Sequence, residues 1–121
     1  MVAVTNEPLQ VQLRKGVLEL CVLALLSRQD GYAYDIASTL AEDVGMGEGT
    51  IYPLMRRMQE DGLVKTYLVE SASGPPRKYY RLTAAGRTAF VAQKAEWQAF
   101  TAAVNKALGE MVWTPPTSGV K

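Results

Sequence analysis

The segment GMGEGTIYPLMRRMQEDGLVKTYLVESASGPPRKYYRLT, residues Gly45–Thr83, decides the fold of this chain of 121 residues. It opens with a helix-forming stretch that ends at Asp61-Gly62. After it, Leu63–Val69 is typical of a strand, Ser71–Pro76 of a turn, and Arg77–Leu82 of a second strand. A helix followed by a two-stranded ribbon with a basic tip rich in proline and glycine is the layout of a winged helix-turn-helix.

Two more helices are predicted ahead of this segment. The first runs from Leu9 to Ser27, where apolar residues recur with a helical period. Asp30-Gly31 ends it, and the second is expected from about Tyr32 to Asp43. The apolar positions are Leu13, Val17, Leu20, Cys21, Ala24 and Leu25 in the first helix, and Ile36, Ala37 and Leu40, expected to be buried, in the second. We therefore predict a winged helix-turn-helix domain over residues 9–83, preceded by a flexible tail over residues 1–8.

The third helix is expected to begin near Glu48 and to bury one stripe of side chains. Apolar residues recur in it at spacings of three and four, at Ile51, Leu54, Met55 and Met58. Pro53 conflicts with a regular helix because it lacks an amide hydrogen and crowds the preceding turn. Either the helix begins late, near Tyr52, or its first turn is distorted.

A fourth helix is predicted over residues 84–112, with Thr83 as its N-cap. Apolar residues stand seven apart along it, at Phe90, Trp97, Val104 and Met111. A seven-residue apolar repeat marks a seam against another helix, so we expect a C-terminal dimerisation helix and a homodimer. Residues 113–121 are expected to form a flexible tail. The predicted fold class is mainly α with a small β-ribbon.

The charges are unevenly distributed, although the net charge is only +1. Residues 71–95 contain no acidic residue but five basic ones, namely Arg77, Lys78, Arg81, Arg87 and Lys94. A protein without large positive charge can bind a polyanion when its cations share one face. A ribbon face that is merely solvated explains the same pattern equally well.

The composition excludes several classes of site. The chain has one cysteine and no histidine, so it lacks an internal disulfide and the usual zinc ligands, and it offers no nucleophile–base pair. We expect no enzyme activity, no metal and no cofactor. Cys21, in the apolar run Leu20–Leu26, is expected to be a buried and inert thiol. That run is too short to span a bilayer and no secretory signal is visible, so a cytoplasmic protein without membrane contact is expected.

The motifs resemble those of the PadR family of transcriptional regulators. GEGTIYPLMRRMQEDGLV and GPPRKYYRLTAAG carry the resemblance, and KGVLELCVLALLS and YAYDI match it further upstream. The resemblance implies a small winged-helix repressor with a C-terminal dimerisation helix, released in some members by phenolic acids or planar aromatic drugs. The chain departs from the family at Gly47, where many members have Ser or Asn, and at Tyr32-Ala33-Tyr34, where many have His-Gly-Tyr.

The candidate DNA-binding residues lie on the third helix and on the ribbon. We expect Thr50 and Tyr52 to meet phosphate or bases, while Arg56 and Arg57 reach the groove, because a guanidinium can pair bidentately with guanine. Alternatively, one arginine pairs with Glu60 and Tyr52 packs against the core.

On the ribbon, Arg77 and Lys78 are expected to neutralise phosphates of double-stranded DNA. Alternation along the second strand places Tyr80 and Leu82 toward the core and Tyr79 and Arg81 on the other face. A solvated tip is the alternative. A winged helix used only as a protein–protein interaction module needs no basic tip, so the acid-free stretch favours DNA.

Phe90 and Trp97 are the candidate effector-binding residues. An aromatic platform between two subunits can stack a planar aromatic small molecule. The alternative is that Trp97 only packs at the interface between the helices.

Overall fold

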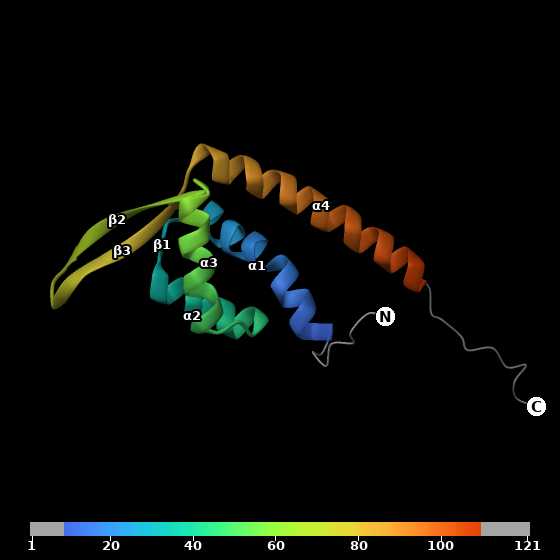
Figure 1. Ribbon diagram of the computed structural model, residues 1–121, viewed down its shortest axis with the longest axis horizontal. Helices are drawn as coiled ribbons and strands as arrows, with labels where there is room; N and C mark the ends of the chain where they lie inside the picture. The colour runs from blue at the N-terminus through green and yellow to red at the C-terminus, as the bar shows by residue number, and fades with distance from the viewer. Residues whose placement is uncertain (1–8, 110–121) are drawn as a thin grey trace, which may run out of the picture.

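The computed structural model of the chain describes residues 9–109. It confirms the predicted fold class: the chain is mainly helical, with a small antiparallel sheet whose ribbon projects from the helices (Figure 1). The predicted tails, residues 1–8 and 113–121, lie outside the described residues. The elements are α1 (Leu9–Arg28), β1 (Gly31–Tyr32), α2 (Ala33–Val44), α3 (Glu48–Glu60), β2 (Val64–Ser71), β3 (Gly74–Leu82) and α4 (Ala84–Leu108).

The core lies between α1, α2, α3 and the base of the sheet. In α3 the buried stripe is the one predicted from the spacing of its apolar residues, and the expected burial of Tyr80 and Leu82 in β3 is also observed. The buried apolar residues are Leu18, Val22, Leu23, Leu26, Ile36, Ala37, Leu40, Met46, Ile51, Leu54, Met55, Met58, Val64, Tyr80 and Leu82.

Helix α1 has two apolar sides, one toward the core and one toward α4. The spacing of its apolar residues did not show which residue belongs to which side. Leu18 and Val22 enter the core, whereas Val17 and Leu20 are only half-buried and line hollows beside α4. Cys21 is half-buried rather than fully buried, because it lies between these two sides. Partial burial raises the pKa of the Cys21 thiol, which favours its protonated and unreactive form.

Strand β1 was not predicted, and the second helix begins one residue after its expected start at about Tyr32. Gly31 and Tyr32 pair with Tyr80 and Tyr79 of β3, so the sheet has the order β1-β3-β2. Tyr32 has extended backbone angles and is the N-cap of α2, which begins at Ala33. A two-residue strand is set by its pairing with a distant strand, and it leaves no periodic pattern of its own.

The turn of the ribbon is shorter than predicted. β2 continues to Ser71 and β3 begins at Gly74, so most of the predicted turn belongs to the strands. Val69 pairs with Arg77 and Ser71 with Gly74, which leaves Glu70 facing both Pro75 and Pro76. Two residues opposite one make a β-bulge, a position where a strand tolerates proline.

Helix α3 begins at Glu48, so the alternative of a late start near Tyr52 is wrong. Pro53 lies inside the helix, where it cannot donate to the carbonyl of Gly49 four residues earlier. Gly49 is exposed, so water can satisfy that carbonyl. The N-cap of α3 is Gly47, which offers no side-chain hydrogen bond.

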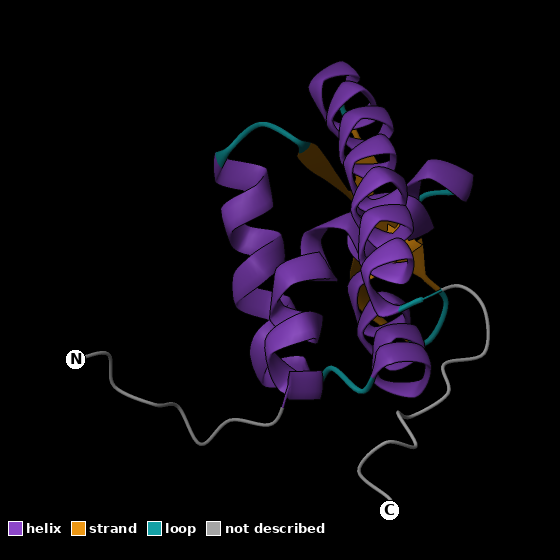
Figure 2. Cartoon of the chain, turned by 90° about the vertical axis from the view of Figure 1, so that its right-hand side faces the viewer, coloured by secondary structure: helices purple, strands orange, loops and turns teal. Residues whose placement is uncertain are grey.

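Helix α4 starts as predicted. The Thr83 hydroxyl accepts a hydrogen bond from the amide of Gly86 at 3.0 Å and donates one to the carbonyl of Gly62 at 2.6 Å. The helix ends at Leu108, four residues before its expected end, because Gly109 takes a positive φ of 90°. Residues 110–112 lie outside the described part of the chain. Figure 2 looks from the end opposite the ribbon and shows the strands behind the helices.

Candidate nucleic-acid interface

Helix α3 presents its predicted DNA-binding side chains in two rows. Tyr52 and Arg56 are four residues apart and lie on one side of the buried stripe, while Thr50 and Arg57 lie on the other. Thr50, Arg56 and Arg57 are exposed, and Tyr52 is half-buried. The four residues therefore form two surfaces rather than one.

The row of Tyr52 and Arg56 faces the sheet. Tyr52 packs against the core, as the alternative interpretation expected, and burial, followed by the charge of Glu48, raises its pKa. Burial raises the pKa of Tyr80 in β3, and the nearby Arg56 guanidinium partly offsets this rise. Arg56 forms no ion pair with residues 9–109, so its guanidinium remains available to a ligand.

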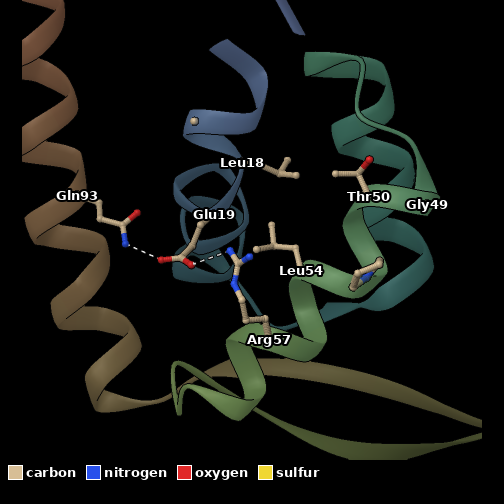
Figure 3. A pocket seen from close by; sticks show the side chains of 9 residues that line it. Leu18, Glu19, Gly49, Thr50, Leu54, Arg57 and Gln93 are labelled. Carbon is tan, nitrogen blue, oxygen red and sulfur yellow. Dashed lines mark hydrogen bonds and ion pairs between the residues drawn. The ribbon is translucent and has the colours of Figure 1, made fainter. Parts of the chain in front are cut away.

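The other row faces α1 and α4, and its arginine is engaged. Arg57 Nη2 lies 3.7 Å from Glu19 Oε1, so the partner is Glu19 of α1 and not Glu60. Gln93 of α4 donates through Nε2 to the other carboxylate oxygen of Glu19 at 2.7 Å (Figure 3). Glu19 of α1 thus links α3 to α4, at the edge of an open hollow of about 680 Å³ that Thr50 also lines.

The two predicted ribbon cations lie on opposite faces of the ribbon. Arg77 lies over the Tyr32 ring, with its guanidinium carbon 4.9 Å from the ring centroid. Lys78 is the next residue in the strand, and its ammonium lies 6.0 Å from the ring centroid of Tyr80 on the core-facing side. Both side chains are exposed. The ribbon can therefore meet anionic groups on either side.

A row of tyrosines covers the outer face of the sheet. The ring centroids of Tyr67 and Tyr79 are 5.8 Å apart, as are those of Tyr79 and Tyr32, and Tyr34 of α2 follows at 6.4 Å from Tyr32. Each strand of the sheet contributes one ring to this row. The tyrosines consequently tie the start of α2 to the base of the ribbon.

Asp30, in the turn after α1, forms hydrogen bonds with side chains of β2 and β3 at the outer face of the sheet. Its Oδ2 atom accepts hydrogen bonds from the Tyr67 hydroxyl at 2.5 Å and from Arg81 Nε at 2.9 Å. Arg81 also lies 5.2 Å from the centroid of the Tyr67 ring. The hydrogen bond from Tyr67 and then the interactions with Arg81 lower the pKa of Asp30, although partial burial opposes them. The turn after α1 is thereby fixed to both long strands.

We expect Asp30→Asn to remove a pH-dependent part of the stability. The lowered pKa of Asp30 means that its ionised form stabilises the fold above the unfolded pKa of about 3.9. That stabilisation is lost as pH falls through the lower folded value. Urea unfolding at neutral pH and at about pH 3 should show the variant less stable than wild type at the first pH, with a smaller difference at the second. Asp43→Asn controls for loss of an exposed charge, and an equal difference at both pH values would contradict the role of Asp30.

Phe90 and Trp97 lie beside α1 in two separate hollows. Phe90 is half-buried and shares a hollow of about 370 Å³ with Leu20 and Ala24 of α1. Trp97 is 40% exposed and lines a hollow of about 390 Å³ with Val17 and Leu20. Both side chains point to the groove between α1 and α4, but within one chain they do not enclose a common cavity.

Comparison with known proteins agrees with this geometry. The family model described as "Transcriptional regulator PadR-like family" matches residues 22–92, more than half of the chain. The chain belongs to the PadR-like family of transcriptional regulators. A PadR-like transcriptional regulator from Bacillus cereus is 37% identical, with a TM-score of 0.75, over 81% of this chain and 97% of that one.

Two further PadR structures show the same fold. A family member from Eggerthella lenta is 36% identical with a TM-score of 0.70, covering 82% of this chain and 88% of its own. One from Clostridium difficile is 33% identical with a TM-score of 0.71, covering 78% and 100%. These similar structures are transcriptional regulators rather than enzymes. Within residues 9–109, no helix is long and apolar enough to cross a membrane.

Sequence reasoning missed three residues that contact the predicted DNA-binding side chains or the sheet beside them. Tyr32 stacks against Arg77, Asp30 binds Arg81, and Glu19 pairs with Arg57. Asp30 lies in a segment whose sequence indicates only a turn. Glu19 lies in a helix whose periodic pattern concerns its apolar residues and says nothing about a single carboxylate. The tyrosine-rich composition of residues 32–80 was the available signal for Tyr32.

Proposed function

We propose that this PadR protein is a dimeric repressor that binds operator DNA through α3 and the ribbon. The observation that supports this most strongly is Arg56, an exposed arginine on the recognition helix without a carboxylate partner in the described chain. Such a guanidinium is free to pair with guanine in the major groove. Arg77 and Lys78 supply phosphate contacts from the ribbon, while Thr50, Tyr52 and Arg57, on α3 itself, meet the DNA beside Arg56.

In this function the chain has two parts. Residues 9–83 act as the DNA-binding domain, and α4 acts as the dimerisation helix. We expect a repressor of this kind to act on its operator in the cytoplasm. Fluorescence anisotropy with genomic fragments selected by the purified protein tests the binding. Selective retention of a fragment over random duplex is expected, and equal affinity for both would contradict sequence-specific regulation.

Dimerisation through α4 is expected because the helix carries apolar side chains that nothing covers within residues 9–109. Phe100 is 60% exposed and Leu108 is 68% exposed, on the same side of α4 as Trp97. In Figure 1, α4 extends further to the right than the other helices, so its end lies beside no other helix or strand of residues 9–109. A second copy of the chain can cover it by two-fold symmetry.

Phe100→Glu is expected to convert the dimer into a monomer, because a charge at a buried seam is strongly unfavourable. Sedimentation velocity at micromolar concentration measures the change. Val91→Glu is the matched control, since Val91 is 67% exposed on a different side of α4. A wild type that sediments as a monomer would overturn the proposed dimer, and loss of dimer in both variants would remove the assignment of the seam.

We also propose that a planar aromatic effector binds beside Trp97, with Phe90 near its edge. The exposed indole and the hollows along α1 support this site. Such a compound should quench Trp97 fluorescence, and it releases the operator only if it binds the DNA-free form more tightly. Titration of a panel of planar aromatics against wild type and Trp97→Ala measures this. Identical affinities would leave Trp97 as interface packing.

A protein–protein interaction module without specific DNA binding is the second candidate. The exposed apolar face of α4 is the observation that favours it, because that face can also accept an unrelated partner. Salt dependence separates the two candidates: DNA affinity falls steeply with salt when phosphates are neutralised. A protein without affinity for any duplex at low salt would support the second candidate.

A further inference from the structure

Glu19, on α1, contacts two other helices at once. Its Oε1 atom lies 3.7 Å from Nη2 of Arg57 in α3, and its Oε2 atom accepts a hydrogen bond of 2.7 Å from Nε2 of Gln93 in α4 (Figure 3). Both carboxylate oxygens are therefore engaged, one by α3 and one by α4. A carboxylate that is held from two sides keeps a fixed orientation toward Arg57.

The two contacts of Glu19 differ in strength. The hydrogen bond from Gln93 is short, and it joins two half-buried side chains. The contact with Arg57 is long for an ion pair, and 62% of the Arg57 side chain is exposed, compared with 26% of the Glu19 side chain. An ion pair with so exposed a partner is weak, so another anion can compete with Glu19 for Arg57.

A DNA backbone that reaches this side of α3 is such an anion. Arg57 and Glu19 line the open hollow of about 680 Å³ together with Thr50, a residue that we propose meets DNA. Among the described residues that line the hollow, Glu19 is the only acid. Its charge offsets that of Arg57 and also repels a phosphate that approaches the hollow. Both effects reduce what Arg57 adds to DNA binding.

We propose that Glu19 is a positioning residue that withholds Arg57 from DNA, and that Gln93 fixes Glu19 in this role. The inference rests on the proposed DNA-binding function. In wild type Arg57 then adds little to DNA affinity, because its guanidinium is already paired. Gln93 belongs to the helix that we propose forms the dimer, so the contribution of Arg57 depends on how α4 lies against α1.

Glu19→Gln tests this role through a gain of binding. The amide keeps the shape of the side chain and can still accept from Gln93, but it has no charge to hold Arg57. Affinity for a random duplex of about 30 base pairs at about 100 mM salt should rise about 1.5- to 5-fold, the range of an exposed ion pair. The slope of log affinity against log salt should steepen by up to about 0.9, the value for one phosphate contact. A side chain that only stabilised the fold would not raise affinity on removal, so unchanged or weaker binding would overturn the inference.

A double-mutant cycle tests whether the gain acts through Arg57. Arg57→Ala should weaken binding slightly in wild type but should cancel the whole gain in Glu19→Gln, so the two changes are not additive. Glu60→Gln is the matched control, because it removes one negative charge from the last residue of α3, which has no ion pair within residues 9–109. A gain that survives Arg57→Ala, or an equal gain in Glu60→Gln, would be a general effect of charge and would contradict the role of Glu19.

Gln93→Met tests the contribution of α4. Methionine keeps the length of the side chain but cannot donate to Glu19, which then loses its fixed orientation. We expect part of the gain that Glu19→Gln gives, and Arg57→Ala should cancel this gain as well. A Gln93→Met protein with the affinity and salt slope of wild type would overturn the role of Gln93.

Failure of this inference is distinguishable from failure of the proposed function. If wild type binds no duplex even at low salt, DNA binding itself is wrong. If wild type binds duplex DNA while Glu19→Gln binds it with the same affinity and the same salt slope, the contact between Glu19 and Arg57 only joins the helices, and the inference is wrong.

Discussion

Gly86→Ala is expected to lower the free energy of unfolding by at least ~2 kcal/mol, since overpacking a closed contact costs about 1–3 kcal/mol or more. A Cβ atom at position 86 would lie 2.1 Å from the carbonyl oxygen of Leu63 and 3.1 Å from its carbonyl carbon. These are backbone atoms in the turn between α3 and β2, so they cannot move aside without displacing the start of α4. Urea denaturation followed by circular dichroism measures the loss.

Gly16→Ala is the matched control for this substitution. Gly16 also lies inside a helix, but a Cβ atom there would meet nothing within 4 Å. Alanine at that position should raise stability by about 0.5–1 kcal/mol, because it restricts the unfolded chain and favours helix. A Gly86→Ala protein as stable as Gly16→Ala would show that α4 is not docked as closely as the structure places it.

Arg56→Ala is expected to cost about 1–3 kcal/mol of binding free energy on the selected operator fragment, which is roughly 5- to 150-fold, and little on random duplex. The reason is that Arg56 is exposed on the recognition helix without a competing carboxylate in residues 9–109. Anisotropy titrations on both duplexes at the same salt concentration give the two affinities.

Arg57→Ala is the natural comparison, because it removes the same charge one residue further along α3. Arg57 lies by Glu19 and its side chain is 62% exposed, so its loss should weaken both duplexes by a similar small factor. Equal losses on both duplexes for Arg56→Ala would instead show that Arg56 contacts only phosphate.

Features that depend on neighbouring residues could be predicted from the sequence. The buried stripe of α3 follows from spacings of three and four, and the Thr83 cap is a local hydrogen bond to Gly86. The burial of Tyr80 and Leu82 follows from strand alternation. In each case the physical cause acts within a few residues, so a sequence pattern records it.

Features that join distant segments could not be predicted. Glu19 and Gln93 are 74 residues apart in the chain, and Asp30 and Tyr67 are 37 apart. No spacing rule relates such residues before the fold is known. The different environments of Arg56 and Arg57 could not be predicted for the same reason. Only the position of Glu19 in the fold shows that Arg57, and not Arg56, is paired with a carboxylate.

The ribbon illustrates a different limit. Pro75 and Pro76 indicated a turn, since proline cannot donate to a strand ladder. In the structure they lie opposite Glu70 in a bulge, where one side of the ladder is already interrupted. The rule that proline cannot donate a hydrogen bond to a neighbouring strand holds here, but it led to a turn being predicted at residues that belong to β3.

Selection of bound fragments from the source genome, followed by footprinting of the enriched site, tests the central claim most directly. A dimer that places two α3 helices in successive major grooves should protect two inverted half-sites about 34 Å apart, and the retention should fall with salt. Enrichment of no fragment over random duplex, or protection of a single half-site without a symmetric partner, would contradict a dimeric operator-binding regulator.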